Sequence, residues 1–103
     1  MKQNYMKADM QMKNQIYYPE PLLEPELGNT ATQLYLFLLR KSLLSGKSDS
    51  RYLYLELSVE EISYMIFRSP STIKRALNRL EEAGLIERRP QGKGKKNHWY
   101  VMI

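Results

Sequence analysis

The stretch SPSTIKRALNRLEEAGL, residues 69–85, constrains the fold of this chain most strongly. Ser69 suits a helix N-cap, and Pro70 suits the first helical position, where the N–H group that proline lacks has no partner within the helix. Gly84 suits the left-handed position just after a helix end. We therefore predict a helix from about Pro70 to Ala83. Its apolar residues recur at helical spacing and should face a core: Ile73, Ala76, Leu77 and Leu80.

A shorter helix is expected immediately before it. Ser58 and Glu61 have the spacing of a capping box, so this helix should begin at Val59. It must end near Arg68, because Ser69 and the following proline start the next helix in a new direction. Its predicted buried residues are Ile62, Met65 and Ile66. Two helices joined by a tight turn form a helix-turn-helix.

Three segments are predicted to be strands. YLYLEL (52–57) alternates tyrosine or glutamate with leucine, so its leucines should point inward. LIERR (85–89) and HWYVMI (98–103) flank PQGKGKKN (90–97), which reads as a hairpin with a flexible basic loop. One ring of Trp99 and Tyr100 is expected in the core, while stacking on single-stranded bases remains an alternative.

The most apolar helix is expected earlier in the chain. NTATQLYLFLLRKSLLSG (29–46) should start with Asn29 or Thr30 as the cap and stop before Gly46. GKSDSR (46–51) should then form a polar loop. The predicted core positions are Leu34, Phe37, Leu38, Lys41 and Leu44, widened by Leu36, Leu39 and Leu43. The fold class is therefore mainly α with a small β-hairpin (α+β), a winged helix-turn-helix spanning residues 29–103.

Residues 1–28 differ in composition from the rest of the chain. The first fifteen are rich in Met, Lys, Gln and Asn, and PEPLLEPELG places prolines at 19, 21 and 25. Closely spaced prolines forbid a continuous helix. We expect a loose N-terminal arm followed by an extended strap over 16–28. A disordered tail and a dimerising segment remain open alternatives.

The charge is concentrated in one third of the chain. Residues 68–98 hold nine basic and three acidic side chains, whereas the whole chain has a net charge of +5. A nearly neutral body with one cationic region indicates a polyanionic partner, and double-stranded DNA fits a helix-turn-helix.

Residue types assign roles within this region. Lys74 and Arg75 can donate to guanine, and Asn78 can pair with adenine. Hydroxyl groups at the helix start suit a phosphate, and lysines on a glycine-rich loop can follow the DNA backbone. The predicted DNA-binding residues are Arg68, Ser69, Ser71, Thr72, Lys74, Arg75, Asn78, Arg79, Arg89, Lys93, Lys95, Lys96 and Asn97.

Other function classes lack a signal. The chain has no cysteine and one histidine, so thiolate metal sites and disulfides are excluded. GKGKK lacks the spacing and following helix of a Walker loop. We expect no enzyme activity, cofactor, metal or small-molecule ligand. Without an apolar run of about 18 residues or a secretory signal, we expect no membrane contact and a cytoplasmic protein.

A family resemblance follows from longer segments. NTATQLYLFLLRKSLLS together with YLELSVEEISYMIFRSPSTIKRALNRLEEAGLIERRPQGKGKKNHWYV resembles the N-terminal DNA-binding domain of RepA-type plasmid replication initiators of low-GC Gram-positive bacteria. The resemblance covers about residues 29–101. It implies sequence reading by the helix that holds Lys74, Arg75 and Asn78, and backbone contacts from the loop of residues 93–96.

The same resemblance implies a homodimer on repeated origin sites, replication proteins as further partners, and a nucleoid- or plasmid-associated location. Two alternatives remain open at this point. One is a winged-helix transcriptional repressor, and the other is a protein-interaction winged helix that does not bind DNA.

Overall fold

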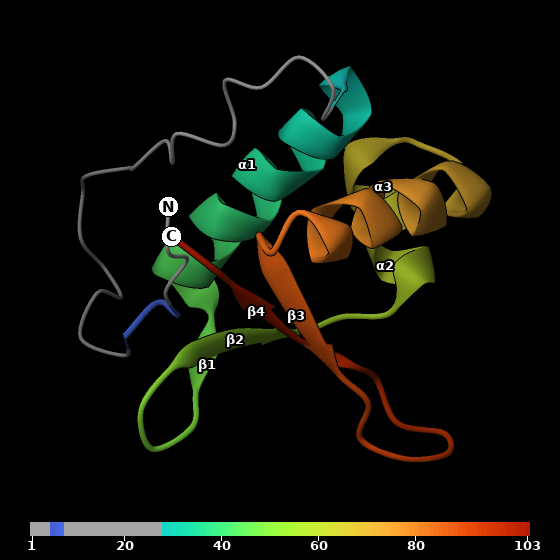
Figure 1. Ribbon diagram of the computed structural model, residues 1–103. Helices are drawn as coiled ribbons and strands as arrows, with labels where there is room; N and C mark the ends of the chain where they lie inside the picture. The colour runs from blue at the N-terminus through green and yellow to red at the C-terminus, as the bar shows by residue number, and fades with distance from the viewer. Residues whose placement is uncertain (1–4, 8–27) are drawn as a thin grey trace.

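The computed structural model describes residues 5–7 and 28–103. In these residues the first and third helices pack on one face of a four-stranded antiparallel sheet with the strand order β1-β2-β4-β3, and the second helix packs against the third (Figure 1). The elements are α1 (Asn29–Ser45), β1 (Lys47–Ser48), β2 (Leu53–Glu56), α2 (Val59–Ile66), α3 (Pro70–Glu82), β3 (Ile86–Arg89) and β4 (His98–Val101). The predicted α+β winged helix-turn-helix architecture is confirmed.

The helix-covered face of the sheet forms the core. Leu53, Leu55 and Leu57 are buried, as their alternation with polar and aromatic residues predicts. Trp99 is fully buried, and its indole Nε1 donates a hydrogen bond of 2.9 Å to the carbonyl of Leu57. Tyr100 is buried as well. Both rings therefore belong to the folded domain, and a role in stacking on single-stranded bases is excluded by their burial.

Local capping signals set the ends of α2. The amide of Glu61 donates to Ser58 Oγ at 3.0 Å, and Glu61 Oε1 accepts from the amide of Ser58 at 3.0 Å, which completes the predicted capping box. At the other end Phe67 adopts a left-handed conformation with φ 57° and turns the chain toward α3.

The ends of α3 also follow the prediction. The side chain of Ser69 caps the helix by accepting from the amide of Thr72 at 3.2 Å. Gly84 has φ 75°, and the amide of Leu85 donates to the carbonyl of Leu80 at 2.9 Å. This bond closes the last turn in the manner of a Schellman motif.

The start and the buried face of α1 differ from the prediction. The N-cap is Gly28 rather than Asn29 or Thr30, with φ 87° and no side-chain cap. Leu44, expected inside, is 63% exposed. Leucines occur on most sides of this helix, so their spacing alone does not determine which side is buried. The buried side is determined by packing against the sheet and α3. The buried residues are Ala31, Leu34, Tyr35, Leu38, Leu39, Ser42 and Leu43.

Two further positions need correction. Met65 in α2 is 38% exposed, because this short helix buries one narrow stripe around Ile62. The expected polar loop over residues 46–51 contains β1, which pairs with β2. The carboxylate of Asp49 accepts from the amides of Arg51 and Tyr52 at 2.7 Å each, so a local side-chain turn closes this hairpin.

Residues 5–7 belong to the folded domain, in contrast to the expected loose arm. Tyr5 forms a bridge with Met102, and Lys7 forms one with Tyr52. Between them Met6 is 1% exposed, and its carbonyl accepts from the amide of Leu53 at 2.9 Å. The apolar side chain of Met6 drives this docking. The other residues of the predicted arm and strap, 1–4 and 8–27, lie outside the described residues.

Candidate nucleic-acid interface

The outward face of α3 is polar and cationic. Its inward residues, which include Ile73, Leu77 and Leu80, are buried and fix the helix against the core. This packing fixes where each outward side chain begins, although the side chains themselves extend into solvent. The exposed residues of this face are Ser71, Lys74, Arg75, Asn78 and Arg79, and Thr72 beside them is half-buried.

Side chains at the start of α3 already have intramolecular partners. The hydroxyl of Ser69 caps the helix and lies 2.8 Å from Thr72 Oγ1 and 3.3 Å from Ser71 Oγ. Arg68 donates from Nη2 to Gln33 Oε1 at 3.1 Å, which ties the turn to α1. These contacts order the N-terminal end of α3, the end that can meet base edges in a helix-turn-helix.

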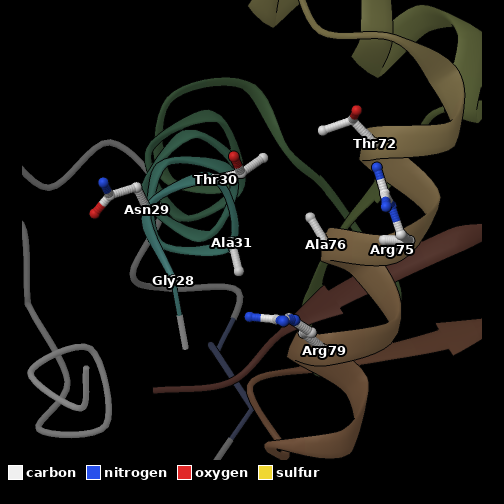
Figure 2. Close-up of a pocket in the computed structure, with 8 residues that line it drawn as sticks. All are labelled: Gly28, Asn29, Thr30, Ala31, Thr72, Arg75, Ala76 and Arg79. Atoms are coloured by element: carbon white, nitrogen blue, oxygen red, sulfur yellow. The ribbon is translucent and has the colours of Figure 1, made fainter. Parts of the chain in front are cut away.

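A cleft of about 320 Å³ lies between α3 and the beginning of α1. In Figure 2 the side chain of Arg79 extends toward Gly28, whereas that of Arg75 follows α3 toward Thr72. No acidic residue lies in the first turn of α1, and the N-terminal end of a helix carries partial positive charge. Two arginines and this helix end are therefore the positively charged groups in the described lining of the cleft. Its lining consists of Gly28, Asn29, Thr30, Ala31, Thr72, Arg75, Ala76 and Arg79.

The basic loop between β3 and β4 forms a second cationic element, and we call residues 90–97 the wing. Its lysines, Lys93, Lys95 and Lys96, are exposed, and Asn97 is half-buried. Gly92 has φ 113°, a conformation that favours glycine, and an added Cβ there would meet no atom within 4 Å. The wing leaves the sheet on the same side of the molecule as α2 (Figure 1). Lys96 Nζ lies 2.8 Å from Glu61 Oε1 of α2.

Arg89, predicted as a DNA contact, lies at the end of β3 beside the start of the wing, opposite His98 of β4. It is on the sheet face that the helices leave uncovered, where it donates from Nε to Glu87 and from Nη2 to the hydroxyl of Tyr5 at 3.2 Å. Its guanidinium lies 4.2 Å from the centre of the Tyr100 ring. The hydrogen bond to Glu87 is the main cause that raises the pKa of Arg89. Arg89 therefore has intramolecular partners within the domain.

The same sheet face carries an aromatic cluster that we did not predict from the sequence. The rings of Tyr5 and Tyr52 are stacked at 4.6 Å, and those of Tyr54 and His98 at 4.2 Å. Tyr100 donates from its hydroxyl to Asp49 at 2.8 Å, and burial raises the pKa of Tyr100 to about 12. The spacing of Tyr52 and Tyr54 could have predicted part of this cluster, because residues two apart in a strand point to the same face of the sheet.

Neither a metal-binding cluster nor a membrane-spanning helix occurs among the described residues. No group of three His, Cys, Asp or Glu side chains in residues 5–7 and 28–103 could hold a metal ion. No helix among those residues is long and apolar enough to cross a membrane. What the arrangement can do is present a rigid cationic helix and a pliable cationic wing to one extended polyanion.

Comparisons with known proteins agree with this architecture. A solved structure described as the N-terminal domain of a DNA binding protein superposes with a TM-score of 0.72, covering 99% of this chain and 85% of that one. The two sequences are 19% identical, so this likeness concerns the fold. No curated protein matches the sequence significantly.

Residues 32–94 match the Crp-like helix-turn-helix domain. The matched region extends from α1 through α2 and α3 into the wing, which is more than half of the chain. Such domains are typically non-enzymatic, and the match supports DNA as a partner of this chain. The chain therefore belongs to the Crp-like helix-turn-helix domain family.

Proposed function

We propose that this chain binds double-stranded DNA at specific sequences and acts at the replication origin of a plasmid or other mobile element. One observation carries the DNA-binding part: the cationic outward residues of α3 stand on a helix that four buried apolar side chains fix to the core. The origin part rests on the resemblance of residues 29–101 to plasmid replication initiators.

In this proposal α3 enters the major groove. Lys74 and Arg75 donate to guanine, and the amide of Asn78 pairs with adenine. Ser71 and Thr72 meet the phosphate next to the start of the helix. Arg79 points into the cleft beside α1, which suits a backbone phosphate at the flank of the groove.

The wing holds the flanking backbone. Lys93 and Lys95 are exposed on a loop whose glycines allow it to adapt to the DNA, so they contribute charge without fixed geometry. Lys96 and Asn97 complete this contact. The turn residues Arg68 and Ser69 support the phosphate contacts at the start of α3, since both already have partners that hold them there.

We infer a homodimer from the small number of base pairs that one recognition helix can contact. One recognition helix reads only about 3–4 base pairs directly, so two copies on repeated or two-fold related half-sites would supply useful specificity. Replication proteins would then be recruited to the DNA-bound dimer, at the plasmid or the nucleoid.

The test is selection of bound sequences from a random duplex library, followed by titration of the selected DNA. Tight binding of the full chain to repeated sites, and to plasmid origin fragments in preference to promoter fragments, supports the proposal. Preference for promoter fragments would instead indicate a transcriptional repressor with the same fold. Absence of duplex binding at low salt would indicate a protein-interaction module.

A further inference from the structure

One wing lysine has a partner that competes with DNA. Lys96 Nζ lies 2.8 Å from Glu61 Oε1, and the same oxygen accepts the capping hydrogen bond from the amide of Ser58 at 3.0 Å. The side chains of Lys96 and Glu61 are 49% and 37% exposed, so the pair stands at the surface where DNA could reach it. The ion pair joins the wing to the first turn of α2.

Glu61 is better prepared for this pairing than an ordinary surface glutamate. A surface ion pair is usually weak because two long side chains must give up their freedom to form it. Here the capping box already fixes Glu61, so only Lys96 becomes ordered. The hydrogen bond from Lys96, followed by the one from Ser58, lowers the pKa of Glu61.

The pair opposes the proposed DNA contact. While Glu61 holds Lys96, the carboxylate offsets the charge of the lysine, so the pair attracts an approaching phosphate less than an unpaired lysine would. The other two wing lysines, Lys93 and Lys95, form no ion pair with the described residues. A phosphate that approaches the base of the wing therefore competes with Glu61 for the third lysine.

We propose that Glu61 is an internal competitor for Lys96, and that Lys96 exchanges the Glu61 carboxylate for a DNA phosphate when the wing docks. The inference rests on the proposed function. This competition lowers the affinity of the wing for DNA of any sequence. The base contacts of α3 then account for a larger share of the difference in affinity between specific and random DNA.

The experiment is a thermodynamic cycle in the full chain with the variants Glu61→Gln, Lys96→Ala and the double variant. The glutamine keeps a side-chain oxygen that can accept from the amide of Ser58, so the cap of α2 survives while the charge is lost. Thermal unfolding of each variant verifies that it is folded. Glu60→Gln is the matched control, because Glu60 is an exposed neighbour on the same helix turn and loses the same charge.

We expect Glu61→Gln to raise affinity for both selected and random duplexes by about two- to fivefold, the range of a surface ion pair. Glu60→Gln should change it by less than half as much. In the Lys96→Ala background the gain from Glu61→Gln should fall to that of Glu60→Gln, because no lysine is left to release.

Three results would overturn the inference. A full gain from Glu61→Gln that persists without Lys96 would mean that Glu61 only repels DNA at a distance. A loss of affinity in Glu61→Gln would mean that Glu61 positions Lys96 for its contact, and no change would mean that the two do not compete. These outcomes all require a wild-type chain that binds duplex DNA; if it does not bind, the proposed function itself fails.

Discussion

The sharpest functional prediction concerns the outward face of α3. Replacing Asn78 by alanine should weaken binding to the selected duplex by about 1–3 kcal/mol, which is the usual value of one good bidentate base contact. That energy corresponds to about a 5- to 150-fold increase in Kd. Asn78 is uncharged and exposed, and its helix is fixed by buried side chains, so the substitution removes an amide without disturbing the fold.

Arg75 differs from Asn78 in what its side chain can reach. Arg75 lines the cleft beside α1 as well as the outward face, so its guanidinium can reach a base or a phosphate. Arg75→Ala should also cost about 1–3 kcal/mol on the selected site. Asn78→Ala should leave both the affinity for random duplex and the salt dependence unchanged, because no charge is removed.

The assay is fluorescence anisotropy with one selected and one shuffled duplex at the same salt concentration. Arg51→Ala serves as the matched control for loss of a cation, because Arg51 is exposed and belongs to the β1–β2 loop. Figure 1 shows this loop away from both α3 and the wing. Equal weakening of both duplexes by Asn78→Ala would refute base reading by this residue. Loss of discrimination in wing variants alone would reverse the roles of α3 and the wing.

Three other perturbations test separate parts of the account. Lys95→Ala should weaken binding to selected and random duplexes alike and flatten the salt slope by about one unit, as a titration at several salt concentrations would show. Met6→Ala should lower the free energy of unfolding by about 2–3 kcal/mol in denaturant titrations, because Met6 is 1% exposed; no change would contradict the docking of residues 5–7. Hydrogen bonds from the amides of Tyr52 and Arg51 and then the hydroxyl of Tyr100 lower the pKa of Asp49. The ionised Asp49 carboxylate therefore stabilises the folded state above its unfolded pKa of about 4, and this stabilisation is lost as the pH falls through its lower folded pKa. The free energy of unfolding of Asp49→Asn should consequently decrease less steeply in acid than that of the wild type.

Local signals made the helix-turn-helix and the wing predictable from the sequence. The capping box of Ser58 and Glu61, the Ser69–Pro70 pair and Gly84 each determine the backbone within a few residues, and the structure has each of them as expected. These signals place Lys74, Arg75 and Asn78 on an exposed face, because the intervening positions must be buried.

Features that depend on distant contacts were not predictable in the same way. The face of α1 is chosen by what packs against it, since Leu36 and Leu44 are as apolar as the residues that are buried. Met6 docks beside Leu53 through pairing between remote segments. The partner of Lys96 is likewise far along the chain. Arg89 is different, because strand alternation places it with Glu87 on the face opposite the core.

The salt dependence of duplex binding tests the central claim most directly, because it counts the phosphates that the cationic surface neutralises. If each subunit meets roughly 4–6 phosphates through α3, the cleft and the wing, log K should fall with log salt at a slope of about −4 to −5 per subunit. A slope in this range, obtained with both selected and random duplexes, is the predicted result. A slope near zero, or no binding at low salt, would contradict a DNA-binding role for this surface.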